Sequence, residues 1–442
     1  MSFEKQIKSR ENFSTKLGFI LACIGSAVGM GNIWLFPYRV GEFGGAAFLI
    51  PYIIFTTLLG FTGVVGEMAF GRAMKTGPLG AFKKAFEKRG KKYGAIIGLI
   101  PVIGSLGIAI GYSVVCAWIF RFLVGSITGS LTNAPNSIAY FESIAGNFGS
   151  IPWHLACLVI ILIILSLGVS EGIEKINKIL MPSFFILFAI LAIRTFFLEG
   201  SIEGYKYLFL PKWEYLKNIK TWVFALGQAF FSLSIAGSGT VVYGSYLKES
   251  EDIIDSAKYV VIFDTIAALL SAMVIIPSVF AYNMDPTAGP PLMFITLPSV
   301  FKQIPLGRIF SIVFFIAVFF AAITSLMNLL ETPIETLQHK FNLSRKSSVY
   351  IIVGIVAISG TFIQNANMVG IWMDVLSIYI IPLGALLAGI AFYWICGKNF
   401  AREKIQMGRD KKIGKWFEPM TNLFITLTFI VYILGIAFGG IG

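Results

Sequence analysis

Two stretches of the chain combine glycine and polar residues inside long apolar segments. Residues 25–32 read GSAVGMGN, and residues 230–239 read FFSLSIAGSG. Backbone groups inside a membrane must be satisfied without water, so a helix interrupted there needs partners for the groups that the break frees. Freed carbonyls can coordinate a cation, and the N-terminus of a half-helix can face an anionic group. These stretches therefore favour the binding of a cation beside an anionic group.

Close helix packing is the alternative for residues 25–32, because Gly25 and Gly29 have the four-residue spacing that lets transmembrane helices approach each other. Asn32 argues against packing alone, since a polar group is costly at that depth, and Gly31 adds flexibility that packing does not require. Discontinuous transporter helices tend to occur at corresponding places of two internal repeats. The second stretch lies where the first helix of a second half is expected.

The composition indicates that membrane-spanning helices position these stretches. Of the 442 residues, 56% are hydrophobic and 13% are charged, and the mean hydropathy is +0.80, which is not the composition of a soluble domain. A helix needs roughly 18 to 20 apolar residues to span a bilayer. Segments of about this length predict eleven helices, at 17–38, 43–66, 93–120, 152–170, 179–193, 221–247, 256–284, 309–330, 347–373, 375–397 and 419–442.

The net charge of +12 could indicate a nucleic-acid partner, but the positive-inside rule explains it. Most Lys and Arg residues fall in loops that are cytoplasmic if the N-terminus is inside, above all residues 72–92 and 398–415. We therefore expect a lipid bilayer and no nucleic acid as a partner. With eleven helices, the N-terminus is expected to be cytoplasmic and the C-terminus extracytoplasmic.

The residue pattern does not favour an enzyme. The four cysteines lie in predicted spans without a CxxC spacing, and His154 and His339 are unclustered. No nucleophile arrangement, phosphate loop or cofactor motif appears. A channel would need a continuous polar pore and a receptor would need a soluble signalling domain, and we expect neither. A transporter is the class that remains.

Residues 25–52, GSAVGMGNIWLFPYRVGEFGGAAFLIPY, resemble the first and second helices of the neurotransmitter:sodium symporter family, in its bacterial amino-acid transporter branch. GEMAFGR, FFSLSIAGSGTVVYGSY, AAITSLMNLLE and NLSRK continue the resemblance in order over nearly the whole chain. It implies an all-α integral membrane protein with a five-plus-five inverted repeat, discontinuous helices 1 and 6, and an eleventh helix. The expected parts are a cytoplasmic segment 1–16, a first repeat 17–198, an extracellular loop 199–220, a second repeat 221–397, and a cytoplasmic loop with helix 11 at 398–442.

The resemblance implies two sodium sites. The first would use the carbonyl of Ala27 and the side chains of Asn32, Ser232 and Asp264, together with a carboxylate oxygen of the substrate. The second would use the carbonyls of Gly25, Val28 and Ala321 and the hydroxyls of Thr324 and Ser325. From the residues alone, a hydrogen bond between helices is the alternative role for Thr324 and Ser325.

Asp264 is the most informative single residue, because a carboxylate inside a span indicates function by default. In family members that need chloride, an anion near the first sodium site supplies negative charge, and a serine is among its ligands. The aligned position here is Ala268. With Asp264 already negative, and with Tyr52, Gln228 and Ser232 as its expected neighbours, we predict that transport is independent of chloride.

The resemblance also implies a substrate site. The carboxylate of the substrate would contact the amides of Met30 and Gly31 and the hydroxyl of Tyr112. The walls of the site are mostly apolar, which favours a neutral hydrophobic amino acid as the substrate. A leucine-selective relative has a bulky aromatic residue where this chain has Gly237, which favours tyrosine, tryptophan or phenylalanine over leucine, unless Gly237 serves only to bend the backbone. The full expected set is Ala27, Met30, Gly31, Ile108, Tyr112, Phe231, Ser232, Ser234, Gly237, Ser325 and Leu329.

The same resemblance implies an outer and an inner gate. Arg39 with Asp374, which is expected to open helix 10, would form the outer pair, although an exposed Arg39 without a partner is the alternative. Arg10, Phe13 and Tyr246 match residues under the transport path. The aspartate that should receive Arg10 aligns with His339. Glu335, one turn earlier, is a candidate substitute, and a looser inner gate than in relatives is the alternative.

Three further residues have expected structural roles. Glu67 would accept hydrogen bonds from the unwound backbones of helices 1 and 6, with proton coupling as the alternative. Gly172 and Pro182 would bracket a place where helix 5 unwinds to let water reach the second sodium.

The predicted function is sodium-coupled import of an amino acid by alternating access, in the inner membrane of a bacterium. A monomer is expected to suffice for transport, while the oligomeric state stays open. A proton-coupled transporter of the same architecture is the alternative, and the hydroxyls of Thr324 and Ser325 favour sodium.

Overall fold

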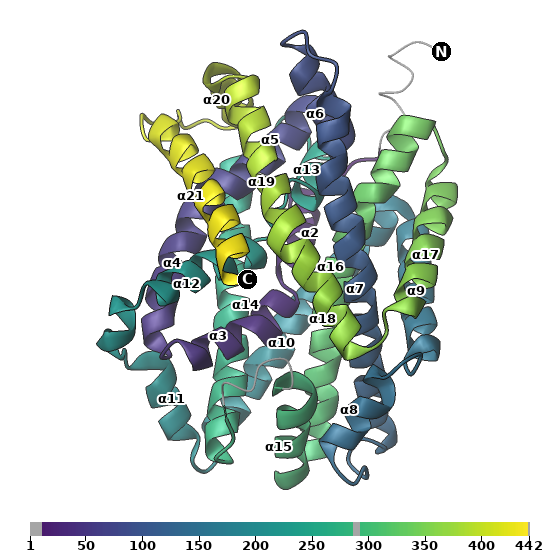
Figure 1. Ribbon diagram of the computed structural model, residues 1–442, viewed down its shortest axis with the longest axis vertical. Helices are drawn as coiled ribbons and strands as arrows, with labels where there is room; N and C mark the ends of the chain where they lie inside the picture. Colours follow the sequence, from purple (N-terminus) through teal and green to yellow (C-terminus); the bar gives the residue numbers. More distant parts are fainter. Residues whose placement is uncertain (1–10, 286–291, 441–442) are drawn as a thin grey trace.

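The computed structural model describes residues 11–285 and 292–440, and every regular element in these ranges is a helix (Figure 1). Eight described helices are long and apolar enough to cross a membrane, and a bent pair near the N-terminus makes nine. The shorter helix α9 (Ile151–Ser166) and an interrupted pair account for the two other predicted spans. The expected all-α membrane fold is confirmed.

The first span is broken where the sequence predicts. α2 (Lys16–Ala27) is followed by a short non-helical stretch, by the π-helix η1 (Gly31–Leu35) and by α3 (Phe36–Glu42), with a bend of 50° between the halves. The glycines also allow close packing, because a Cβ on Gly25 would lie only 2.1 Å from the side-chain oxygen of Asn177. Both interpretations of residues 25–32 therefore hold: the helix is broken, and its glycines are tightly packed.

The sixth span is broken as well. α12 (Ile219–Ser232) and α13 (Gly239–Ser245) are separated by residues 233–238, which are not helical. Ser234 and Gly237 have positive φ angles of 52° and 67°, a region that glycine adopts without the steric cost that other residues incur. The interruptions in the first and sixth spans fall at corresponding places of the two predicted halves.

The remaining spans form a bundle around these two broken helices (Figure 1). The two longest, α7 (Gly94–Thr128) and α16 (Gly307–Phe341), pack against each other in its centre. The other spans are α4 (Ala46–Leu59) with η2 (Gly60–Val64) and α5 (Val65–Met74), η3 (Val169–Glu174) with α10 (Lys175–Phe196), α14 (Ile253–Ala281), α17 (Arg345–Phe362) and α21 (Phe417–Phe438).

The predicted boundary between spans nine and ten, at residue 374, is wrong. α17 ends at Phe362, and the next span begins with α18 (Ala366–Val375), so Asp374 lies within a helix rather than at its start. Asn365 caps α18 by accepting a hydrogen bond from the amide of Asn367 at 2.9 Å. Gln364, Asn365 and Asn367 mark this turn in the sequence, but the prediction followed the longer apolar segments on either side and placed the boundary at the charged residue Asp374 instead. The span continues through η6 (Leu376–Ile380), α19 (Ile381–Gly389) and η7 (Ile390–Ile395).

Short helices connect the spans and lie at the two ends of the bundle. In Figure 1, α6 (Pro78–Glu87) and α20 (Lys398–Gln406) lie at the upper end. α8 (Ser137–Ala145), α11 (Ser201–Phe209) and α15 (Leu297–Gln303) lie at the lower end. The described chain also contains two single turns, η4 (Trp213–Lys217) and η5 (Leu292–Thr296).

The contact between α5 and α13 gives a test of the fold. A Cβ on Gly71 would lie 1.8 Å from the carbonyl oxygen of Val241, so the backbone of one helix must move in a Gly71→Ala variant. We expect a loss of about 1–3 kcal/mol in stability, as is typical of overpacking, and a lower melting temperature in detergent. Gly354→Ala is the matched control, because a Cβ there meets no atom within 4 Å. Equal melting temperatures for the two variants would contradict the packing.

Candidate functional site

The side chains predicted for the first sodium site converge around Asp264, which is fully buried in α14. The Asn32 amide nitrogen donates to Asp264 Oδ1 at 2.8 Å and to Ser232 Oγ at 2.9 Å. Ser232 Oγ lies 2.9 and 2.8 Å from the two carboxylate oxygens, and the Tyr52 hydroxyl lies 3.3 Å from Oδ2. Neutral groups alone surround the carboxylate in this cluster. The cluster is therefore an arrangement of oxygen atoms around a buried carboxylate whose hydrogen-bond donors in it are all neutral.

Further contacts fix the backbone beside this cluster. Gln228, a predicted neighbour, donates its amide to the carbonyl of Gly31 at 2.9 Å, and the Gly29 amide donates to Asn32 Oδ1 at 3.1 Å. Ala27 lines the adjacent cavity. Ala268 is fully buried in α14, one turn beyond Asp264.

The groups predicted for the second site also meet. Ser325 Oγ lies 3.2 Å from the carbonyl oxygen of Gly25 and 3.1 Å from that of Val28. Thr324 Oγ1 lies 3.0 Å from the carbonyl oxygen of Ala321. These oxygens come from the break in the first helix and from one face of α16. The same hydroxyl of Ser325 thus bridges two helices and belongs to a set of five oxygens suited to a hard cation.

A cavity lies between the two broken helices, α7 and α16. Tyr112 contributes its hydroxyl, which accepts a hydrogen bond from the Met30 amide at 3.3 Å. Most of the predicted substrate residues line the cavity, namely Ala27, Met30, Gly31, Ile108, Tyr112, Phe231, Ser234, Ser325 and Leu329. Ser232 belongs to the cluster around Asp264 instead. Sequence reasoning missed the polar lining residues Ser26, Ser238 and Asn328.

Gly237 does not line this cavity. A Cβ at Gly237 would lie 2.4 Å from the carbonyl oxygen of Gly384 in α19, and the φ angle of Gly237 is positive. The interpretation in which Gly237 only bends the backbone fits this geometry. Gly237 therefore gives no support to an enlarged substrate pocket.

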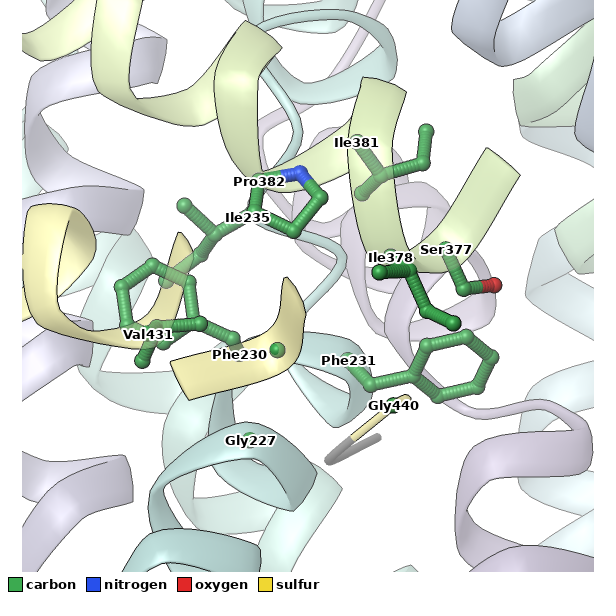
Figure 2. A pocket seen from close by; sticks show the side chains of 11 residues that line it. Gly227, Phe230, Phe231, Ile235, Ser377, Ile378, Ile381, Pro382, Val431 and Gly440 are labelled. Carbon is green, nitrogen blue, oxygen red and sulfur yellow. The ribbon is translucent and has the colours of Figure 1, made fainter. Parts of the chain in front are cut away.

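A second, apolar cavity lies behind the wall of the first (Figure 2). Phe230, Phe231, Ile235 and Ile381 line both cavities. Figure 2 shows these side chains around an open centre, with Ser377 and Ile378 of η6 on one side and Val431 of α21 on the other.

Glu67 is buried and supports the break in helix 6. Its Oε1 accepts a hydrogen bond from the Gly237 amide at 2.6 Å. Among the described residues, Glu67 accepts no hydrogen bond from the break in helix 1. The expectation that it supports the breaks in both helices is therefore corrected to helix 6 alone. Gly172 lies in the π-helix η3, and Pro182 lies inside α10, which continues unbroken from Lys175 to Phe196. The fifth span is therefore helical between these two residues, and the expected unwinding stays a prediction.

The predicted outer pair is not formed. Arg39 makes an ion pair with Glu42, three residues later in the same helix, at 2.8 Å. Its guanidinium also lies over the ring of Phe224, 4.3 Å from the ring centre. Asp374 is exposed on α18. A partner one turn away needs no movement between helices, which explains why Arg39 pairs with Glu42.

At the opposite end, Phe13 packs edge-on against Tyr243 and Tyr246, with ring centres 5.6 and 6.3 Å away. Glu335 accepts hydrogen bonds from the Gly77 amide at 2.7 Å and from Thr76 at 3.1 Å, so it holds the turn between α5 and α6. Arg10 lies outside the described residues. The pairing of Arg10 with Glu335 therefore stays a prediction.

Sequence reasoning missed a buried ion pair below this aromatic cluster. Arg345 binds both carboxylate oxygens of Glu331, at 2.7 and 2.8 Å, and the Tyr246 hydroxyl donates to Glu331 at 2.7 Å. Glu331 is fully buried. The predicted span ended at residue 330, so Glu331 fell one residue outside it and was not recognised as a carboxylate inside a span. α16 continues to Phe341, which places Glu331 within the helix, where a carboxylate needs a partner.

The comparisons with known proteins agree with this geometry. A family model described as the sodium:neurotransmitter symporter family matches residues 10–142 and 135–438. The sodium-dependent transporter YhdH of Bacillus subtilis is 35% identical, covering 98% of this chain and 96% of that protein. A sodium-dependent transporter of Methanocaldococcus jannaschii is 32% identical, over 96% of this chain and 90% of that protein. Both relatives are uncharacterized.

Among solved structures, MhsT in complex with L-phenylalanine has a TM-score of 0.86 and 32% identity, and the match covers 97% of this chain and 99% of MhsT. The fold is that of a multi-pass membrane transporter. The chain belongs to the sodium:neurotransmitter symporter family.

The buried ion pair generates a second prediction. Arg345→Met leaves Glu331 buried without its counter-ion, and removal of one partner of a buried pair costs about 3–5 kcal/mol. We expect a large drop in melting temperature, and a smaller drop when Glu331→Leu is added. Lys206→Met is the control, because its pair with Glu203 at 2.7 Å is exposed and such pairs contribute about 0–1 kcal/mol. Similar melting temperatures for the Arg345 and Lys206 variants would contradict this role.

Proposed function

We propose that the protein imports a neutral hydrophobic L-amino acid together with sodium ions bound at two sites. It works by alternating access in a bacterial cell membrane, with its N-terminus in the cytoplasm. The observation that carries this proposal is the cluster around Asp264 beside the cavity. A buried carboxylate among neutral donors is stabilised by a cation, and the carboxylate of a bound amino acid would add one more oxygen.

The second set of oxygens supports a second sodium ion. Ser325 donates one proton among three carbonyl oxygens, those of Gly25, Ser26 and Val28. A single proton satisfies such a set only in part, whereas an ion can contact several oxygens at once. Binding of substrate and ions would then complete the coordination that the broken helices leave open, and this favours closure only when all are present. One chain holds both sites, so a monomer suffices.

The substrate proposal is an aromatic amino acid, tyrosine, tryptophan or phenylalanine, with leucine next. The similar transporter MhsT was solved with L-phenylalanine. The apolar lining by Ile108, Phe231 and Leu329 suits a hydrophobic side chain. The amides of the broken first helix and the hydroxyl of Tyr112 suit the substrate's carboxylate.

Chloride independence follows from the position of Asp264. The hydroxyls of Tyr52 and Ser232, which would be expected around an anion, both donate to its carboxylate. A fixed negative charge beside the first sodium makes a second anion unnecessary.

The membrane potential supplies the driving force. Two sodium ions carried inward with a zwitterion are worth about 4.6 kcal/mol per 100 mV. At about 1.4 kcal/mol per tenfold change, the potential alone supports about a thousandfold accumulation.

The first test is uptake into proteoliposomes. Labelled phenylalanine, tyrosine, tryptophan and leucine are offered with and without an inward sodium gradient, in chloride and in gluconate. We expect sodium-driven uptake of the aromatic amino acids that is unchanged in gluconate. Uptake that ignores sodium but follows a proton gradient would replace the proposal with proton coupling, and a requirement for chloride would overturn the role of Asp264 as the fixed anion.

Asp264→Asn gives a third prediction. It keeps the size of the side chain but removes the charge, so we expect the sodium concentration for half-maximal uptake to rise about tenfold or more, as for the loss of one charged interaction. Asp374→Asn is the matched control, because it makes the same change at an exposed aspartate, whereas Asp264 is fully buried. Equal sodium dependence in the two variants would rule out Asp264 as a ligand.

A further inference from the structure

A buried amide of the fifth span faces the second sodium site. Asn177 belongs to α10 and its side chain is fully buried. α10 packs against both α2 and α16, the two helices that supply the oxygens of that site. No group of α10 is among the ligands that the sequence predicts.

The orientation of this amide is fixed by its one hydrogen bond. The Asn177 Nδ2 donates to the carbonyl oxygen of Ile173 at 2.8 Å. Because a carbonyl oxygen can only accept, the nitrogen must occupy this position, and Oδ1 is the atom on the other side. Oδ1 has no hydrogen-bond donor among the described residues. A buried amide oxygen without a partner is costly, so its retention calls for an explanation.

The unpartnered oxygen lies against the second sodium site. A Cβ built on Gly25 would be 2.1 Å from Asn177 Oδ1 and 2.9 Å from Thr324 Cβ. Gly25 and Thr324 both belong to the predicted ligand set, and Ser325 Oγ already lies 3.2 Å from the Gly25 carbonyl oxygen. Oδ1 therefore borders the site from a third helix.

Amide oxygens are good ligands for hard cations and need no change of protonation to bind them. In this interior a cation is the partner that would satisfy Oδ1 and the carbonyls of the broken helix together. The space at Gly25 also matters, since any side chain there would separate Oδ1 from the site.

We propose that Asn177 Oδ1 is a further ligand of the second sodium ion, contributed by α10. This inference rests on the proposed sodium coupling and adds a third helix to the site. With this ligand, a bound sodium ion would contact α10 as well as α2 and α16, so the position of the fifth span would depend on whether sodium is bound.

The test compares three variants of the full-length protein in detergent. Asn177→Leu removes the oxygen at similar volume, Asn177→Asp keeps an oxygen and adds a charge, and Thr195→Val removes a buried hydroxyl of the same helix that bonds only to the backbone of Leu191. Melting temperature is measured as a function of sodium concentration, with potassium replacing sodium. Binding of radioactive sodium is measured in parallel.

We expect Asn177→Leu to raise the half-saturating sodium concentration about tenfold, the size of a lost interaction with a charged group. Asn177→Asp should retain sodium affinity, and Thr195→Val should match the unsubstituted protein. In potassium, Asn177→Leu should melt close to the unsubstituted protein, because the substitution also removes an unsatisfied polar atom.

Three results distinguish a failure of the proposed function from a failure of the assignment of Asn177. If the unsubstituted protein neither binds sodium nor gains stability from it, the proposed function itself fails. If the unsubstituted protein binds sodium and Asn177→Leu has the same sodium dependence, only the assignment of Asn177 is overturned. A variant that melts much lower in potassium, with unchanged sodium affinity, would show that Asn177 has a packing role instead.

Discussion

The absence of water from the interior of a membrane protein is the constraint on which this structure depends. A break in a helix frees amide and carbonyl groups, and each must find a partner inside the bundle. Gln228 satisfies the carbonyl of Gly31, Glu67 satisfies the amide of Gly237, and Ser325 satisfies part of the carbonyls near Gly25. Groups that these contacts satisfy only in part are the ones available to an ion or a substrate. The binding site is thus made from the same backbone groups that make the broken helices costly.

Close packing is the second condition, and glycine provides it. At Gly25 and Gly71 a single carbon atom would collide with a neighbouring helix. Such contacts hold the halves of the broken helices against their neighbours, with Gly25 against the side chains of Asn177 and Thr324 and Gly71 against the backbone of α13. They also place polar groups of different helices within hydrogen-bond reach, as for Asn32, Ser232 and Asp264.

The sequence predicted the broken spans and most of the site because those features leave local signals. Polar and glycine residues in an apolar segment are visible in the chain itself, as is Asp264 within a span. The ion-pair partner of Arg39 was not predicted correctly. Glu42 and Asp374 are both candidate partners in the sequence, and the arrangement of the helices determines which of them lies within reach. The prediction that Gly237 enlarges the pocket failed for a related reason. Whether position 237 faces the cavity depends on how the six non-helical residues 233–238 bend, and the sequence does not show this bend. The turn at Asn365 was missed although Gln364 and Asn367 are polar, because the charged residue Asp374 indicated the boundary instead.

The second cavity has a mechanical consequence for selectivity. Phe230, Phe231, Ile235 and Ile381 form a wall with open space on both faces, whereas most core side chains are packed from all directions. A side chain that borders empty space has fewer contacts to lose by moving, so these four residues resist a larger substrate less than fully packed neighbours would. One methylene group in a well-packed apolar pocket changes binding by about 1–3 kcal/mol. Side chains that can move aside reduce this penalty. The transporter would then bind several hydrophobic amino acids with affinities that differ only modestly.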